Sequence, residues 1–108
     1  MKVTKGKNGL PVYELGFAIE GLTDEFGDSL PAVTHVTFLR DYLTTDDLIT
    51  VVEVCGDVSK LATDTAMQFK VVRALLPRMT DLPAELVGII RAKDFQELVQ
   101  VMAPFLVI

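Results

Sequence analysis

Residues 33–56 read VTHVTFLRDYLTTDDLITVVEVCG, and the spacing of their apolar side chains changes halfway along the segment. In the first eight residues, polar and apolar side chains alternate, with Val36 and Phe38 on one side, which is typical of a β-strand. Further on, a threonine precedes Asp46 and Asp47. This pattern predicts a helix start, because a hydroxyl group caps free backbone amides and acidic residues favour the positive end of a helix.

The last part of that segment, residues 48–55 (LITVVEVC), is open to two interpretations. Its β-branched residues suit a third strand. The helix start that precedes it, and Gly56 directly after it, favour a short helix, since glycine suits a helix end. We therefore predict a helix here and keep the strand as the alternative.

Another strand is predicted over residues 12–20, where polar and apolar residues again alternate. Its apolar side chains share one face: Tyr13, Leu15, Phe17 and Ile19. We expect this strand to pair antiparallel with residues 33–40. The connection between them, GLTDEFGDSLPA, is acidic and long for a hairpin, so it is expected to be exposed.

Apolar residues at helical spacing predict further helices. The first runs from Leu61 to about Leu76, where Pro77 is expected to end or kink it. A short helix is predicted to open within residues 81–85 (DLPAE), with the proline near its first turn, and to run to about Ile90. The last helix begins at Asp94, and a proline near its end is expected to disturb its final turn.

The predicted fold class is α+β, with a short N-terminal antiparallel β element followed by a small bundle of three to four helices. A chain of 108 residues suits one domain. We place this domain at residues 12–108, with the β element over 12–40 and the helical part over 45–106. Residues 1–11 carry three lysines and are expected to form a flexible basic arm.

Composition argues against several classes of function. Half of the residues are hydrophobic, which excludes a disordered chain. The net charge of −5 argues against nucleic-acid binding. A single cysteine excludes an internal disulfide, and one cysteine with one histidine does not suit a zinc site. Apolar runs are too short for a membrane span or a signal peptide, so neither a membrane nor a nucleic acid is an expected partner.

Residues 27–30 read GDSL, the motif of a class of serine hydrolases. A hydrolase needs a base beside Ser29, but the one histidine, His35, follows six residues later, up to about 20 Å along an extended chain. Ser29 also resembles the attachment site of acyl carrier proteins, where a serine that opens a helix carries phosphopantetheine. We keep a small carrier that uses Ser29 as a remote alternative. No catalytic, cofactor-binding or metal-binding residue is predicted.

The feature that stands out is an excess of apolar side chains on the predicted helices. A small domain has limited capacity to bury them, and exposed apolar patches usually mark partner sites. The C-terminal end carries no charged side chain after residue 97. We therefore predict that a partner binds there, through Met102, Phe105, Leu106, Val107 and Ile108.

Three stretches resemble the phage tail assembly chaperones of the Mu-like type. Residues 37–48 (TFLRDYLTTDDL) are similar to that family's L-R-x-(x)-T-x-x-D-L pattern, and residues 74–86 (ALLPRMTDLPAEL) to its A-L-L-x-x-L-T-G-L-P-x-E-x-L pattern. Like the family, the chain closes with a D-aromatic-x-x-L stretch, DFQEL at 94–98, and a Phe-Leu pair. The sequence departs from the family at Pro77, inside the helix end, and at Asp81, where the family has glycine.

The resemblance implies a non-enzymatic chaperone in the cytoplasm of the host bacterium. Such proteins bind the long tape-measure protein, keep it soluble, and leave as the tail tube polymerises around it. The resemblance therefore implies absence from the mature virion, and binding of several copies along one client suggests a homo-oligomer. The size and the β-plus-helix mix also suit a structural tail or head-completion subunit of a phage or prophage, which is the alternative.

Overall fold

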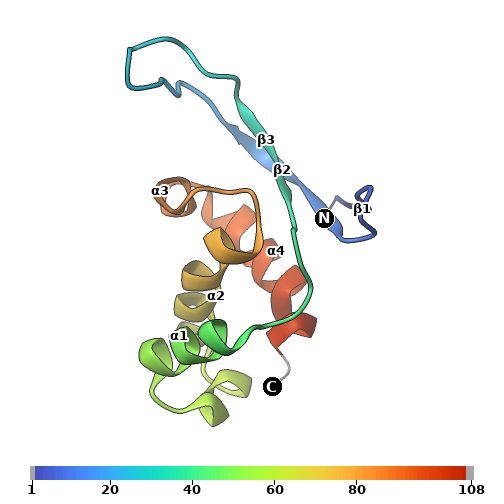
Figure 1. The fold of residues 1–108 in the computed structure, drawn as a ribbon, viewed down its shortest axis with the longest axis vertical. Coiled ribbons are helices and arrows are strands. Elements are labelled where there is room, and N and C mark those ends of the chain that lie inside the picture. Colours follow the sequence, from blue (N-terminus) through green and yellow to red (C-terminus); the bar gives the residue numbers. More distant parts are fainter. Residues whose placement is uncertain (1, 107–108) are drawn as a thin grey trace.

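The N-terminal third of the chain forms an antiparallel sheet of three strands in the computed structural model, which describes residues 2–106 (Figure 1). β2 (Pro11–Ile19) is the central strand, with β1 (Val3–Lys5) on one side and β3 (Val33–Thr37) on the other. The antiparallel pairing predicted for the two longer strands is confirmed, and so is the α+β fold class.

β1 corrects the prediction that residues 1–11 form a flexible arm. Val3, Thr4 and Lys5 pair with β2, and a turn joins the two strands. Within that turn, the side-chain oxygen of Asn8 accepts a hydrogen bond from the amide of Leu10 at 3.0 Å. All three side chains of β1 are exposed, so no buried face marks this strand in the sequence. Backbone pairing alone orders it.

β2 departs from regular pairing, and Phe17 lies outside the core as a result. Tyr13, Leu15 and Ile19 are buried as predicted, whereas the side chain of Phe17 is 48% exposed. The register with β3 shifts in the second half of β2, which interrupts the alternation of inward and outward residues. The ring of Phe17 packs against the guanidinium group of Arg91, 4.9 Å from the ring centroid.

The connection between β2 and β3, residues 20–32, extends the hairpin away from the helices (Figure 1). We call it the hairpin extension. Thr23 and Ser29 pair across it as an isolated bridge. At its tip, the carboxylate of Asp24 accepts hydrogen bonds from the amides of Phe26 and Asp28, both at 2.9 Å. The ring of Phe26 is exposed, in line with the exposed connection that was predicted.

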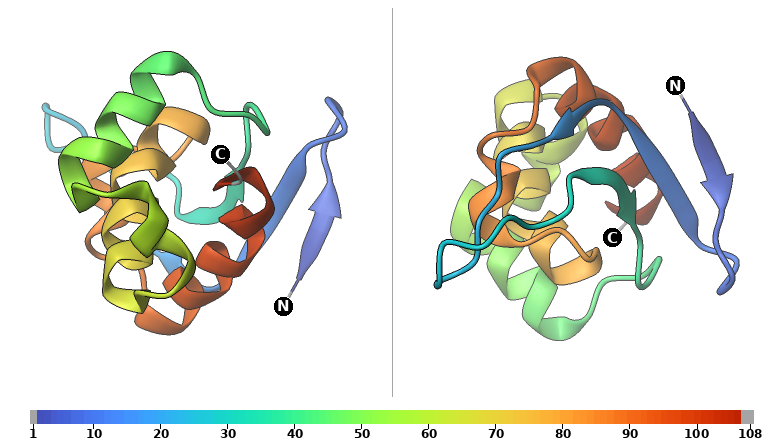
Figure 2. Two further views of the ribbon diagram at one scale, coloured as in Figure 1. Left: turned by 90° about the horizontal axis from the view of Figure 1, so that it is seen from below. Right: turned by 90° about the horizontal axis from the view of Figure 1, so that it is seen from above.

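The helical part follows β3 and is arranged around one central helix (Figure 2). That helix, α2, packs against α1, α3 and α4, and α4 also packs against β2. The fully buried side of α2 consists of Val71, Val72, Leu75, Leu76 and Met79. In chain order the helices are α1 (Thr45–Cys55), the 3₁₀ helix η1 (Val58–Ala62), α2 (Thr65–Met79), α3 (Ala84–Val87), α4 (Ala92–Met102) and the 3₁₀ helix η2 (Ala103–Leu106).

Residues 48–55 lie in α1, so the helix interpretation is confirmed and the strand alternative is wrong. Thr44 is the N-cap of this helix, and Gly56 ends it with a φ of 73°. That positive φ belongs to the left-handed region, which glycine adopts without a Cβ clash.

α2 runs three residues past the predicted end at Leu76 and includes Pro77. A proline this close to a helix end removes one backbone hydrogen bond, while the extra turn buries Met79 completely. The turn is also closed by Thr80, whose amide and hydroxyl both donate to the carbonyl oxygen of Leu76, at 3.0 and 2.6 Å. At its other end the helix starts at Thr65 rather than Leu61, because η1 precedes it and Asp64 caps it.

The prediction that the last helix begins at Asp94 is wrong by two residues, because α4 starts at Ala92. The buried carboxylate of Asp94 instead accepts hydrogen bonds from the amides of Gly16 and Phe17, at 2.8 and 3.1 Å, and from the hydroxyl of Tyr13, at 2.8 Å. A Cβ at position 16 would lie 3.2 Å from the Asp94 Oδ1, so the glycine permits this approach. The irregular part of β2 is thus attached to α4 through its backbone amides.

The carboxylate of Glu97 also lies within hydrogen-bond distance of the Tyr13 hydroxyl, so the two carboxylates share its single proton donor. Burial raises the pKa of Tyr13, and its hydrogen bonds to Glu97 and Asp94 raise that pKa further, since both favour the protonated phenol. The protonated phenol can donate a hydrogen bond to these carboxylates.

The two last helices are shorter than predicted. α3 ends at Val87, with Gly88 as its C-cap, and not near Ile90. α4 ends at Met102, and the residues around Pro104 continue as the 3₁₀ helix η2, so the predicted disturbance of the final turn is confirmed.

We expect Asp94→Ala to lower the free energy of unfolding by about 3 kcal/mol, because two backbone amides and one phenol would lose a shared acceptor. Urea denaturation followed by circular dichroism measures this. Gln96→Ala, at an exposed position of the same helix, is the control and should cost less than about 0.5 kcal/mol. Equal losses in the two variants would contradict the anchoring role of Asp94.

Candidate partner-binding surface

The structure does not assemble a catalytic group around Ser29. Ser29 lies opposite Thr23 in the hairpin extension, whereas His35 lies in β3 opposite Glu14. Both side chains are exposed, and the Nδ1 of His35 is within hydrogen-bond distance of the Thr34 hydroxyl, at 2.8 Å. Within residues 2–106 no three His, Cys, Asp or Glu side chains are grouped as metal ligands would be.

Met102, the first residue of the predicted partner site, belongs to the core. Its side chain has 0% exposure, because it lies on the side of α4 that faces the interior. This corrects the prediction that Met102 contacts a partner. The helical spacing that placed it with the chain end is the same spacing that a core residue has.

Phe105 and Leu106 lie in η2 and are half-buried against the core. The ring of Phe105 packs edge-on against that of Phe38, with 5.8 Å between centroids. Val107 and Ile108, the remaining predicted partner residues, lie outside the described residues.

The exposed apolar side chains of the helical part concentrate on α1, where sequence analysis had not placed a partner site. Leu48, Ile49 and Val52 are 37%, 50% and 43% exposed. Residues spaced by three and four positions share one helix face, so these three form a continuous stripe. We call it the α1 stripe.

A pocket connects the α1 stripe to η2. It has a volume of about 460 Å³ and lies between the start of α1 and the C-terminal turn. Its apolar lining includes Tyr42, Leu43, Leu48 and Phe105. Leu48 therefore belongs both to the stripe and to the pocket, and Phe105 joins the surface from the other end of the chain. We call the stripe together with this pocket the α1–η2 surface.

A second pocket of about 460 Å³ lies on the other side of η2. Its apolar lining comes from η1, α4 and η2 and includes Val58, Leu61, Val99 and Leu106. η2 thus separates two pockets, with Phe105 in one and Leu106 in the other. These two residues are the part of the predicted partner site that the structure places next to accessible apolar surface.

The charged side chains of the segment that carries the α1 stripe are of one sign. Residues 41–57 contain five acidic residues and no lysine or arginine. Four of the five have exposed side chains: Asp41, Asp46, Glu53 and Asp57. The surface is therefore apolar along its centre and negative around it.

The fifth acid, Asp47, is fully buried and holds α1 in place. Its Oδ1 accepts a hydrogen bond from the Nε of Arg78 at 2.7 Å, and its Oδ2 accepts from Arg40 and from the amide of Thr44, the latter at 2.9 Å. The hydroxyl of Thr44 accepts in turn from the amide of Asp47. This reciprocal arrangement is a capping box and confirms the predicted helix start.

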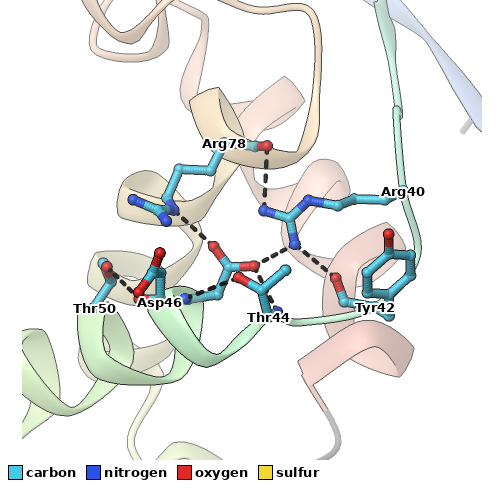
Figure 3. A network of polar contacts seen from close by, with 7 residues as sticks. Arg40, Tyr42, Thr44, Asp46, Thr50 and Arg78 are labelled. Carbon is cyan, nitrogen blue, oxygen red and sulfur yellow. Dashed lines mark hydrogen bonds and ion pairs between the residues drawn. The ribbon is translucent and has the colours of Figure 1, made fainter.

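The two arginines come from different parts of the fold. Arg40 follows β3 and also donates to the carbonyl oxygens of Tyr42, at 2.8 Å, and Arg78, at 3.3 Å (Figure 3). Arg78 lies in the last turn of α2. Asp47 therefore joins β3, α1 and α2 at one point. The hydrogen bond from Arg40, together with those from Thr44 and Arg78, holds the pKa of Asp47 well below its usual range despite burial.

One signal in the sequence indicates the α1 stripe. Residues 48–55 are apolar around most of the helix, and a helix of this kind is either wholly buried or contacts a partner. Val51 and Cys55 occupy its buried side, so Leu48, Ile49 and Val52 are left on the outside. The capping pattern predicts the helix but does not show which of its two faces is buried.

No family model, curated protein or solved structure matches this chain significantly. No helix in residues 2–106 is long and apolar enough to cross a membrane. Function is therefore inferred from the motifs of the sequence and from the α1–η2 surface.

We expect Asp47→Asn to lower the free energy of unfolding by about 2–3 kcal/mol at neutral pH, because two arginines would lose their shared carboxylate. The pKa of Asp47 is lower in the folded than in the unfolded protein. Its contribution is therefore complete above the usual aspartate pKa of about 4 and is lost as the pH falls below it. Urea denaturation at several pH values should show a smaller loss of stability on acidification in Asp47→Asn than in the wild type.

Asp46→Asn is the matched control, since Asp46 is the exposed neighbour in the same helix turn. Its loss should stay below about 1 kcal/mol, the range of a helix-dipole contribution. If Asp46→Asn proved as costly as Asp47→Asn, the buried network would not be what stabilises α1.

Proposed function

We propose that the protein is a phage tail assembly chaperone of the Mu-like type, which binds the tape-measure protein and keeps it soluble during tail assembly. The observation that carries the proposal is the α1 stripe, on which Leu48, Ile49 and Val52 are exposed beside a pocket. An apolar surface of this kind suits a helical client with an apolar side of its own.

The position of the family-like motifs in the fold supports this proposal. Residues 37–48 run from the end of β3 into α1, and residues 74–86 run from α2 into α3. Arg40 and Asp47 belong to the first motif and Arg78 to the second, so the buried ion network joins the two motifs. Residues that carry the resemblance thus form one structural unit beside the α1 stripe.

The acidic residues around the stripe suit the same role. A negative surface keeps a complex with an apolar client from aggregating. Several copies bound along one long client would add avidity, so the proposal includes a homo-oligomer in the presence of the client. The protein acts by binding and not by catalysis, works in the host cytoplasm, and leaves before the virion is complete.

A structural tail or head-completion subunit is the second candidate. The hairpin extension favours it, because an exposed Phe26 at its tip and an exposed Leu30 along it offer contacts for subunit packing. Mass spectrometry of purified particles separates the two, since a structural subunit remains in the particle and a chaperone does not.

We expect co-expression with the tape-measure protein of the same phage to raise the soluble fraction of that client several-fold. Ile49→Asn should lose most of this effect, because it places a polar amide in the middle of the α1 stripe. The soluble and pelleted client are compared on gels after lysis, and circular dichroism checks that the variant remains folded.

Ile89→Asn is the matched control. Ile89 is 58% exposed, close to the 50% of Ile49, but lies after α3 and outside the α1–η2 surface. It should retain the wild-type effect. An unchanged client solubility with the wild-type protein would rule out the chaperone function itself.

A further inference from the structure

We propose that the α1–η2 surface binds an amphipathic helix whose apolar stripe is bordered by lysine or arginine. This inference rests on the proposed function and adds to it the chemistry of the client segment. It is based on the negative charge that borders the α1 stripe, from Asp46 and Glu53 along one edge and from Asp41 at the pocket.

One long edge of the stripe is acidic. Asp46 and Glu53 are seven residues apart, which is close to two helical turns, so they lie on one line along α1. At 100° per residue this line lies directly beside Ile49 and opposite the buried Val51. Both acids are exposed, and neither takes part in an ion pair among the described residues.

The other long edge is hollow and of mixed polarity, since Asp41, Thr44 and Thr45 line it beside apolar side chains. It leads from Leu48 into the pocket that Tyr42, Leu43 and Phe105 line. The pocket volume of about 460 Å³ lies in the range of sites that hold several side-chain-sized groups. A bound helix therefore places its large apolar residues toward η2 and its charged residues toward Asp46 and Glu53.

Within residues 2–106, no lysine or arginine forms an ion pair with Asp46 or Glu53. Arg40 and Arg78 both bind the buried Asp47, and α1 itself contains no basic residue. The charge of Asp46 and Glu53 is thus available to a partner. Because opposite charges across an interface set orientation and partner choice, the complementary client segment is basic along one side.

The same charges disfavour a second copy of this chain as the occupant. An antiparallel two-fold contact between two α1 stripes would bring the acidic edges of both copies together, and a parallel one would place each acidic edge against the pocket edge of the other copy, where Asp41 lies. Like charges placed face to face cost affinity, and the chain as a whole carries −5. Copies that associate on a client therefore do so through another surface.

Designed peptides test this inference. The first is a helical peptide of about 18 residues, or five turns, with a leucine stripe bordered by lysine. The second carries glutamate in place of lysine, and the third has the composition of the first in an order without a stripe. Fluorescence anisotropy should show that the lysine-bordered peptide binds at least tenfold more tightly than either of the others.

Glu53→Lys should reverse the preference. We expect it to lower the affinity for the lysine-bordered peptide by about three- to tenfold and to raise the affinity for the glutamate-bordered peptide. Glu25→Lys makes the same charge change in the hairpin extension, at the other end of the molecule from α1 (Figure 1), and should change either affinity less than about twofold. Val52→Asn should weaken both peptides at least tenfold, since it removes apolar contact from the stripe.

Equal binding of the lysine and glutamate peptides, equal effects of Glu53→Lys and Glu25→Lys, or unchanged binding by Val52→Asn would each overturn the inference. These outcomes are independent of the chaperone test. If the wild-type protein keeps its client soluble while the peptides fail, only the client chemistry is wrong. If the peptides bind as expected and no client is kept soluble, the surface chemistry stands and the chaperone function is wrong.

Discussion

The buried carboxylate of Asp47 sets the position of α1, the one helix within residues 2–106 that offers an apolar stripe to solvent. Burying a carboxylate away from water costs free energy unless cations and amides bind it. Here Arg40, Arg78 and the amide of Thr44 do so. Since those partners come from the end of β3, the start of α1 and the end of α2, the carboxylate is satisfied only when all three are in place. The orientation of the α1 stripe relative to β3 and α2 follows from that constraint.

Asp94 plays a comparable part for the sheet, but through backbone amides and not through cations. It accepts from Gly16 and Phe17 in the irregular half of β2, where pairing with β3 is interrupted. The carboxylate thereby satisfies amides that a regular ladder would have paired. The sheet is thus held to the helices by an interaction that also explains why Phe17 lies outside the core.

Local patterns in the sequence predicted the elements that depend on neighbouring residues. The alternation around Tyr13, the capping threonine before α1 and the glycine after it all have short-range causes. β1 was missed because it has no buried face, and the position of Phe17 because the irregularity depends on a residue far along the chain. Met102 was misassigned because a core residue and a partner residue share the same helical spacing. The α1 stripe needed knowledge of which face of α1 packs on α2, which the spacing does not contain.

The contact between Tyr13 and Asp94 joins residues 81 positions apart. During synthesis the ribosome releases β2 first, and the inner face of the sheet stays uncovered until α4 emerges. The apolar face of the nascent hairpin therefore cannot pack against α4 until most of the chain has been synthesised. During that time this face is open to aggregation. A protein whose proposed task is to shield another chain thus depends, while it is made, on its own late-arriving helix.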